Sequence, residues 1–384
     1  MDTDGATGHQ LGRADRNQLE QALQLAVERA GRDAAGLAAF PHITRDGAWL
    51  VSEHGRWTAG FFVGMLWLAS MVEENGGLES RCRDWCRRLA PRADDRTTHD
   101  MGFLFEPSFV RGFNITGERE LQAVALRAAD SLASRYRPLG RFIPAWDPSE
   151  GDQAYAGLAI VDTVMNLPLL LWAARVRGES RLDGIGRAVA ETIARQHVRE
   201  DGSTVHVIHH DPADPARVRP DTHQGASATS CWTRGQAWAL YGFTRLGVLA
   251  GRADWIELAG RLADTFLERM AGASLAPWDF DRAGPGEPRD AAASAIAASG
   301  LLELSRAAGH TRYAAAAVGI LTGLVKDCLQ RDPQAPGLLR HVSVDVPRGS
   351  GIDVSTMYGD HYFMEALVKL LRPSLWDLLG CVVW

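Results

Sequence analysis

A helical hairpin that recurs along the chain constrains the fold more than any other feature of the sequence. Four times, a segment rich in Gly, Trp and Ala ends at a glycine, and an apolar residue four positions later opens an amphipathic segment. Glycine favours the left-handed conformation just past a helix end, so each glycine marks the turn of a hairpin. The turns are Gly117, Gly178, Gly251 and Gly309, and the second helices open at Leu121, Leu182, Trp255 and Tyr313.

The two helices of each hairpin differ in how their apolar residues are distributed. In the second helices these residues fall three or four apart, as in Trp255, Ala259, Leu262, Phe266 and Met270, which gives one apolar stripe and one polar face. The first helices, at about 101–115, 156–176, 233–249 and 290–307, are apolar or small nearly all round. We expect them to form an inner layer that the amphipathic helices cover.

Two further pairs complete the pattern, 58–75 with 79–90 and 355–371 with an N-terminal helix at 17–31. Six hairpins predict an all-α fold, an (α/α)6 barrel, because repeats that cannot bury their apolar faces alone stack into arrays. The alternative is an open array, but the C-terminal helix needs the N-terminal one as its partner. No linker divides the chain, so we expect a flexible polar N-terminus (1–16) and one domain (17–384).

Composition narrows the class of protein. The net charge of −6 argues against nucleic acid as a partner. No apolar run is long enough to span a bilayer and the N-terminus carries no apolar signal segment, so a cytoplasmic protein is expected. The cysteines are odd in number and scattered, which fits reduced thiols without a disulfide framework or zinc site. They are Cys82, Cys86, Cys231, Cys328 and Cys381.

The segments that join one hairpin to the next are long and hold most of the reactive side chains. They run into the N-terminal ends of the inner helices, which share one face of a ring. Long loops on a rigid scaffold are frequent places for binding and catalysis. We therefore expect them to converge on one central pocket. The segments are 91–100, 137–156, 198–232, 271–289 and 330–354.

Two acidic residues stand out in the expected inner helices. Asp100 opens the segment 101–115, and Asp162 lies inside an otherwise apolar stretch, 159–167. A buried, unpaired carboxyl tends to stay protonated with a raised pKa, the state that a general acid requires near neutral pH. Each has a structural alternative: Asp100 as a helix cap, and Asp162 as a hydrogen-bonding partner of a neighbouring helix.

Other polar groups form weaker patterns. Arg234 and Trp238 are four apart on a predicted helix, which sets a cation beside an aromatic plane. This pair suits a carboxylate and a sugar ring, or equally core packing with a surface ion pair. His209 and His210 lie on alternate faces of a strand-like run, so we expect no metal site there. We expect His206 or His223 to hydrogen-bond a ligand instead.

At these residues the chain resembles family 88 of the glycoside hydrolases, the unsaturated glucuronyl hydrolases. The matching stretches follow the expected order over nearly the whole chain, and the ordered set is much more specific than any single stretch. They are WTAGFFVGMLWLA (57–69), HDMGF (99–103), RFIPAW (141–146), DTVMNLPLLLWAA (162–174), DGSTVH (201–206), HQGASATSCWTRGQAWALYGF (223–243), WDF followed by RDAAASAIAASGLLEL (278–304), and MYGDHYFMEAL (357–367).

The resemblance implies an (α/α)6 barrel and a hydrolase of oligosaccharides left by polysaccharide lyases, glycosaminoglycan fragments among them. The non-reducing uronate of such a substrate carries a C4=C5 double bond and is a vinyl ether. In the implied mechanism Asp162 protonates C4, water adds at C5 and is deprotonated by the same group, and the hemiketal opens to release the aglycone. Asp100 is implied to stabilise positive charge and to orient water or a ring hydroxyl.

By motif, the resemblance also implies the residues that line the pocket. Arg234 is expected to bind the uronate carboxylate, and Trp146 or Trp238 to stack on the sugar. No metal or cofactor is required. Phe62 and Val63 depart from a Trp-Pro pair expected in many relatives, which affects the expected aglycone more than the reaction. The implied pocket residues are Trp57, His99, Trp146, His206, Gln224, Arg234 and Trp238.

Three alternatives share the fold. An unsaturated rhamnogalacturonyl hydrolase acts by the same chemistry on pectin fragments, a non-catalytic protein only binds sugar, and an epimerase leaves the double bond intact. The expected partner is the unsaturated uronyl oligosaccharide, without nucleic acid or membrane. We expect a monomer or a weak homodimer.

Overall fold

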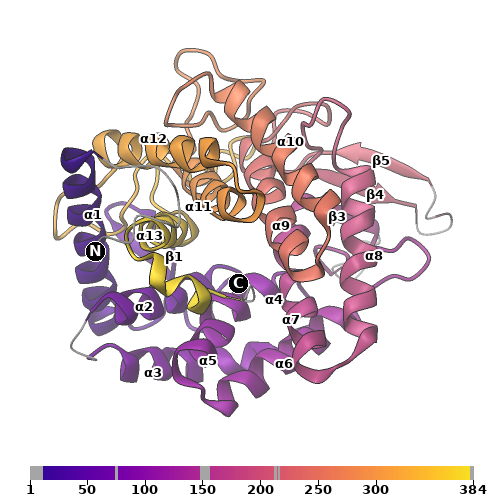
Figure 1. Ribbon diagram of the computed structural model, residues 1–384, viewed down its shortest axis with the longest axis horizontal. Helices are drawn as coiled ribbons and strands as arrows, with labels where there is room; N and C mark the ends of the chain where they lie inside the picture. Colours follow the sequence, from indigo (N-terminus) through magenta and orange to yellow (C-terminus); the bar gives the residue numbers. More distant parts are fainter. Residues whose placement is uncertain (1–11, 74–76, 148–155, 212–213, 215–216, 381–384) are drawn as a thin grey trace.

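The computed structural model describes residues 12–73, 77–147, 156–211, 214 and 217–380, and α-helices dominate them (Figure 1). One set of helices is buried along most of its length, except that α5 is buried only at Arg111 and Gly112. The set is α2 (Ala59–Val72), α4 (Met101–Phe105), α5 (Arg111–Thr116), α7 (Pro168–Arg177), α9 (Thr233–Ala250), α11 (Ala291–Ala308) and α13 (Met357–Leu371). A second set covers it: α1 (Arg13–Gly36), α3 (Glu79–Leu89), α6 (Arg119–Ser134), α8 (Ser180–Gln196), α10 (Ala253–Met270) and α12 (Thr311–Asp327).

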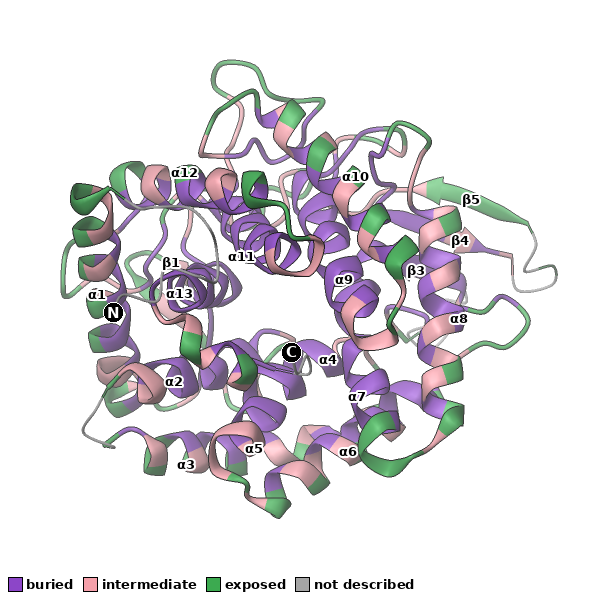
Figure 2. Ribbon diagram, in the orientation of Figure 1, coloured by how far each residue is buried: buried purple, intermediate pink, exposed green. Residues whose placement is uncertain are grey.

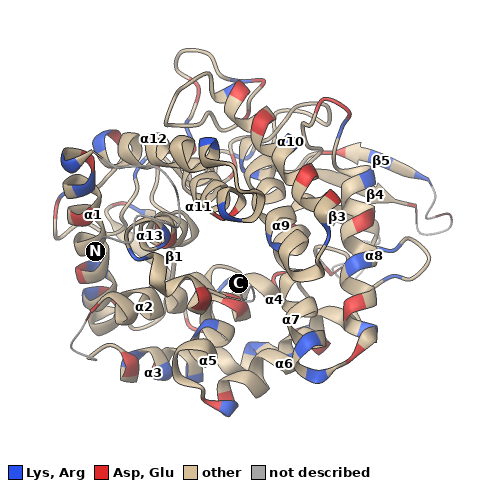
Figure 3. Cartoon of the chain, viewed as in Figure 1, with Lys and Arg blue, Asp and Glu red and all other residues tan. Residues whose placement is uncertain are grey.

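The inner helices contact one another in a closed order. Helix α2 packs on α4, α4 on α7, α7 on α9, α9 on α11, α11 on α13, and α13 again on α2. Each outer helix packs on an inner one, and α1 contacts both α2 and α13, as the sequence predicts for the terminal pair. Figure 2 shows exposed residues on the outward faces of the outer helices, and Figure 3 shows charged residues spread over the same helices.

The glycine turns adopt the conformation that their position predicts. Their φ angles are positive, +71° at Gly117, +67° at Gly178, +62° at Gly251 and +69° at Gly309. Each follows an inner helix, namely α5, α7, α9 and α11. A residue with a Cβ is strained in this region, so glycine ends the inner helix and lets the chain reverse into the outer one.

The expected inner helix at 156–176 is wrong in its first half. Residues Leu158–Ile160 form strand β3, a 3-10 turn covers Val161–Met165, and α7 begins only at Pro168. Strand β3 pairs antiparallel with β4 (Val207–His210), which pairs with β5 (Val218–Asp221). Pairing with a strand about fifty residues away decides this segment, and local periodicity does not reveal such a partner.

Other element boundaries also differ from the sequence expectation. Helix α1 begins at Arg13 rather than at residue 17, while residues 1–11 lie outside the described part. The segment 101–115 is continuous but contains a π-helical stretch at Glu106–Val110, where Pro107 supplies no N–H to the helix. A hairpin of β1 (Phe40–Arg45) and β2 (Ala48–Ser52) was not expected.

Long loops that precede the inner helices contact one another, as the sequence predicts. Thr98 pairs through its backbone with Trp146, whose ring lies 5.0 Å from that of His223. Gln224 Nε2 donates to Val344 O at 2.7 Å. Four of the loop segments therefore meet over the N-terminal ends of the inner helices.

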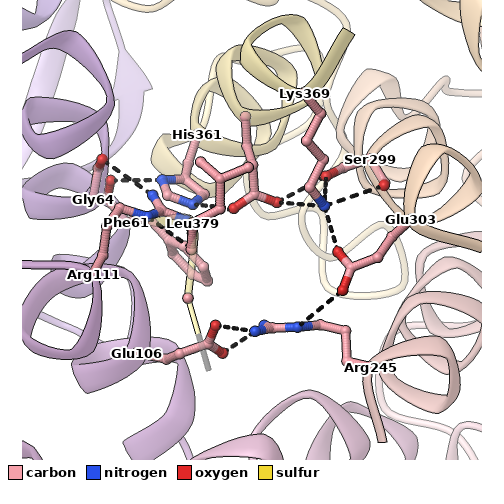
Figure 4. A network of polar contacts seen from close by, with 12 residues as sticks. Phe61, Gly64, Glu106, Arg111, Arg245, Ser299, Glu303, His361, Lys369 and Leu379 are labelled. Carbon is pink, nitrogen blue, oxygen red and sulfur yellow. Dashed lines mark hydrogen bonds and ion pairs between the residues drawn. The ribbon is translucent and has the colours of Figure 1, made fainter. Parts of the chain in front are cut away.

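A network of buried charges joins the inner helices at the other end (Figure 4). Lys369 Nζ lies 2.6 Å from Glu303 Oε2, and Arg111 donates to Glu365 Oε2 at 2.5 Å. The carbonyl of Leu379 accepts from Arg111, which ties the C-terminal segment to the network. Three acids and three bases balance in charge: Glu106, Glu303, Glu365, Arg111, Arg245 and Lys369.

The described residues contain neither a membrane-spanning helix nor a disulfide. None of their helices has the length and apolar character that crossing a membrane requires. Their cysteines, Cys82, Cys86, Cys231 and Cys328, are free and buried, while Cys381 lies outside the described part.

The close approach of α2 to α4 gives a test of the ring. A Cβ at Gly60 would lie 2.2 Å from Phe103 O and 2.3 Å from Leu104 O. We expect Gly60→Ala to lower the free energy of unfolding by about 1–3 kcal/mol, because the backbones must separate. Gly319→Ala in α12 is the control, because nothing lies within 4 Å of its Cβ, and we expect a gain of about 0.5–1 kcal/mol. Equal effects in denaturant titrations would contradict this packing.

Candidate functional site

Asp162 lies in the 3-10 turn between β3 and α7, and the turn is held on two sides. Val161 N donates to His206 O at 3.0 Å, which continues the pairing of β3 with β4. The first turn of α9 packs closely on the other side, since a Cβ at Gly235 would lie 3.1 Å from Val161 Cγ1. Asp162 is 8% exposed, and its Oδ2 is buried without a hydrogen-bond partner. The alternative of a structural hydrogen bond therefore does not hold for this oxygen.

His206 lies close to that oxygen, with its Nε2 3.9 Å from Asp162 Oδ2. The other ring nitrogen, Nδ1, lies 3.2 Å from the backbone N–H groups of both His223 and Gln224. Since a backbone N–H can only donate, Nδ1 accepts and the proton sits on Nε2. Burial, reinforced by nearby positive charge, holds the pKa of His206 well below its ordinary value. A neutral imidazole thus presents an N–H toward Asp162.

Asp100 belongs to a second cluster beside the first. His99 Nδ1 lies 2.8 Å from Thr163 Oγ1, and His99 Nε2 lies 3.3 Å from Asp100 Oδ1. Thr98 Oγ1 donates to Asp100 Oδ2 at 2.6 Å. The Asp100 side chain makes no capping hydrogen bond to its helix, so the helix-cap alternative fails. His99 instead joins Asp100 to the residue that follows Asp162.

Asn166 also fixes the two acidic segments together. Its Oδ1 accepts from Phe103 N at 2.8 Å, and its Nδ2 donates to Asp162 O at 3.3 Å. Gly102 allows this contact, because a Cβ there would lie 2.4 Å from Asn166 Cα. The separation of the two carboxyls is therefore set by backbone contacts and an amide bridge.

The pKa values of the two carboxyls are shifted in opposite directions. Burial raises the pKa of Asp162 to about 6, against the opposing effect of His99 and Arg234, and the charge of Asp100 raises it further. Burial also acts on Asp100, but His99 and the hydroxyl of Thr98 outweigh it and hold the pKa of Asp100 below its ordinary value. One carboxyl that keeps a proton next to one that stays ionised is the arrangement that general acid–base catalysis needs.

Two of the predicted aromatic residues lie partly open to solvent near these groups. Trp57 stacks on Tyr358 with ring centroids 5.1 Å apart and an interplanar angle of 26°. Trp146 is also partly buried. Both could offer an aromatic face to a sugar ring.

Trp238 is placed differently from the prediction. It is fully buried, with its ring 5.0 Å from that of Phe103. The predicted pairing of Arg234 with Trp238 is wrong, because the guanidinium lies 4.5 Å from the Trp232 ring and 5.3 Å from the Tyr358 ring. Helical spacing sets which residues share a face, but the arginine turns instead toward an acidic residue at the start of the neighbouring helix α11.

That acidic residue is Asp290, which accepts a hydrogen bond from Arg234 Nη1. Arg234 Nη1 also donates to Ser343 O at 2.8 Å, and Nη2 donates to Val344 O at 2.7 Å. Gln224 donates to the same Val344 carbonyl. Arg234 therefore binds Asp290 and the backbone at 343–344. These contacts do not favour the expected role of binding the uronate carboxylate.

The histidines of the 198–232 segment have structural partners. His209 Nε2 lies 2.9 Å from Asp221 Oδ2 across β4 and β5. His210 stacks on Phe142, with ring centroids 3.9 Å apart. In the part of the chain that the structure describes, no group of three or more His, Cys, Asp or Glu residues is arranged to hold a metal ion.

Sequence reasoning missed several residues of this site. Thr163 and Asn166 lie in the DTVMN stretch, Tyr358 in MYGDHY and Asp290 in RDAAAS, so the motifs contained them. Only Asp290 carried a further signal, as an acidic residue directly before an inner helix.

The titration of the two carboxyls tests this arrangement. We expect the Asp162 carboxyl to lose its proton with a midpoint near pH 6, because burial penalises its charge. Asp100 is expected to titrate below 3.8, the ordinary value for an aspartate. Carboxyl chemical shifts in ¹³C-labelled protein report both midpoints, with Asp162→Asn for assignment. A midpoint near 4 for Asp162 would contradict a buried carboxyl with an unpartnered oxygen.

Known proteins resemble this chain over most of its length. No family model matches the chain. The unsaturated glucuronyl hydrolase of Bacillus sp. (strain GL1) is 36% identical over 371 residues, covering 90% of this chain and 97% of the relative. The unsaturated chondroitin disaccharide hydrolase of Streptococcus pyogenes serotype M1 is 31% identical over 348 residues, covering 86% of this chain and 84% of the relative.

Solved structures show the same likeness. The crystal structure of unsaturated glucuronyl hydrolase from Bacillus sp. GL1 matches with a TM-score of 0.87 and 33% identity, over 95% of this chain and 99% of that one. An Asp-to-Asn variant of UGL with dGlcA-Glc-Rha-Glc matches with a TM-score of 0.89 and 33% identity, over 95% and 98% of the two chains. The chain therefore belongs to the unsaturated glucuronyl hydrolase family.

Proposed function

We propose that the protein removes the non-reducing 4,5-unsaturated uronic acid from lyase-generated oligosaccharides by hydrating the C4=C5 double bond. The observation that carries this proposal is Asp162, a buried carboxyl with a raised pKa and an unpartnered oxygen, beside the ionised Asp100. A vinyl ether needs a proton donor at one carbon and water at the next, and this pair suits both tasks.

In the proposed reaction Asp162 gives its proton to C4, and the positive charge that develops at C5 and the ring oxygen is stabilised by Asp100. Water attacks C5, and the Asp162 carboxylate takes a proton from it, so the acid is restored. The hemiketal then opens and expels the aglycone. With a pKa of about 6, Asp162 is protonated in roughly one molecule in ten at pH 7, so turnover should rise as the pH falls toward 6.

The side chains around the two acids support binding of an uronyl oligosaccharide. Trp57 and Trp146 are partly open aromatic surfaces, and stacking on a sugar ring is a task for which such surfaces are suited. His206 offers its Nε2–H toward Asp162. We assign Arg234 to positioning of the 343–344 loop, since both Nη atoms already donate to the protein.

The relatives favour a particular substrate class. They are named unsaturated glucuronyl hydrolase or unsaturated chondroitin disaccharide hydrolase, so a glycosaminoglycan-derived disaccharide is the first substrate to test. The closed order of inner helices supports an (α/α)6 barrel and a single domain over 17–384. The ordered sequence motifs support membership of glycoside hydrolase family 88. A cytoplasmic location, supported by the free thiols, and a monomer or weak homodimer complete the proposal.

The proposed activity has a direct assay. Incubation with unsaturated chondroitin, hyaluronan, heparin or gellan disaccharides should remove the ultraviolet absorbance of the conjugated double bond. We expect Asp162→Asn to lower turnover by about 100-fold or more, since it lacks the transferable proton, while substrate binding is retained. Asp264→Asn on the outer helix α10, which bonds Arg312, is the control and should keep full activity.

Two outcomes would redirect this assignment. Turnover of pectin fragments in preference to glycosaminoglycan products would favour a rhamnogalacturonyl hydrolase. Persistence of the absorbance with every substrate would contradict the hydration chemistry, and would favour sugar binding if affinity remained or an epimerase if the sugar were isomerised.

A further inference from the structure

Asp290 makes two kinds of contact at the start of α11. Its Oδ1 accepts from the backbone N–H groups of Ala292 at 3.1 Å and Ala293 at 3.3 Å, so it caps the helix. Its Oδ2 accepts from Arg234 Nη1 on the neighbouring helix α9. The carboxyl is fully buried, and the ion pair is therefore not screened by solvent.

Arg234 stands at the first turn of α9, next to the turn that carries Asp162. Gly235 lets α9 approach Val161, as described above, and Gly242 does the same further along, since a Cβ there would lie 2.6 Å from Val164 Cγ1. The guanidinium is 1% exposed. A buried guanidinium at this place acts on Asp162 as a cation, and any charge that compensates it changes the acidity of Asp162.

We propose that Asp290 is a positioning residue of the site, which holds Arg234 on the 343–344 backbone and cancels its charge so that Asp162 can keep a proton. Without Asp290, an unopposed guanidinium would favour the ionised form of Asp162. Arg234 is needed to hold the 343–344 backbone. Asp290 offsets the effect that the Arg234 charge would otherwise have on the Asp162 proton. This role rests on the proposed function of Asp162 as the acid.

Other charged and titratable groups around Asp162 do not replace Asp290. His99 and Asp100 lie on the segment before α4, His206 directly precedes β4, and Tyr358 lies on α13. His206 is neutral, and His99 faces Asp100 at 3.3 Å. The Arg234 charge is compensated by Asp290, its ion-pair partner in the structure.

Asp290→Asn tests the proposal, because asparagine also caps a helix and preserves shape while the charge is lost. We expect the Asp162 carboxyl midpoint to fall by about 1 pH unit, and kcat/KM at pH 7 to fall about ten-fold with its alkaline limb moved by the same amount. Arg234→Gln should move the midpoint in the opposite direction. A purely structural role would not produce shifts of opposite sign.

Asp279→Asn is the matched control. Asp279 is fully buried and accepts from Ser230 Oγ at 2.7 Å and Ala226 N at 2.9 Å. Its substitution removes a buried charge that does not pair with Arg234, so the Asp162 midpoint should stay in place while thermal stability falls. Asp290→Ser retains a capping residue and serves as the second charge-removing variant if Asp290→Asn does not fold.

The two proposals fail in different ways. A wild-type protein that turns over no unsaturated disaccharide contradicts the proposed function, whatever the variants do. An Asp162 midpoint that is unchanged in Asp290→Asn or Asp290→Ser, measured by ¹³C shifts in folded protein, overturns the role of Asp290 even if turnover is intact.

Discussion

The burial of one carboxyl group, with one of its oxygens left without a hydrogen-bond partner, is the constraint on which the site depends. Taking Asp162 Oδ2 out of water raises the free energy of the charged form, and this cost is what keeps a proton available. The fold accepts the cost because the turn is fixed on several sides: β4 holds the backbone of Val161, and α9 packs against it through Gly235. A looser turn would let water reach the carboxyl and remove the effect.

The polar groups nearby preserve that condition. His206 is held neutral and presents an N–H, so it adds no positive charge beside Asp162. Asp100 stays ionised through His99, which disfavours a second negative charge at Asp162. Arg234, the buried cation that would oppose the proton, is paired with Asp290. Each of these side chains therefore helps Asp162 to keep its proton.

Much of this could be predicted from the sequence, but for different reasons at different residues. Gly117 and Gly251 identify hairpins because a helix end with positive φ depends on the local backbone, which the residue type itself indicates. Asp162 was found because an acid in an apolar stretch is costly in any secondary structure, although the expected helix proved to be a strand and a 3-10 turn. The partner of Arg234 lies 56 residues away, and no local pattern could distinguish it from Trp238.

The most direct measurement is a crystal structure of Asp162→Asn bound to an unsaturated disaccharide. The account predicts that the side chain at position 162 approaches C4 of the unsaturated ring to about 3.5 Å or less, with Asp100 on the side of C5 and the ring oxygen. A complex in which that side chain faces the anomeric carbon, or in which the unsaturated ring binds away from both acids, would contradict it.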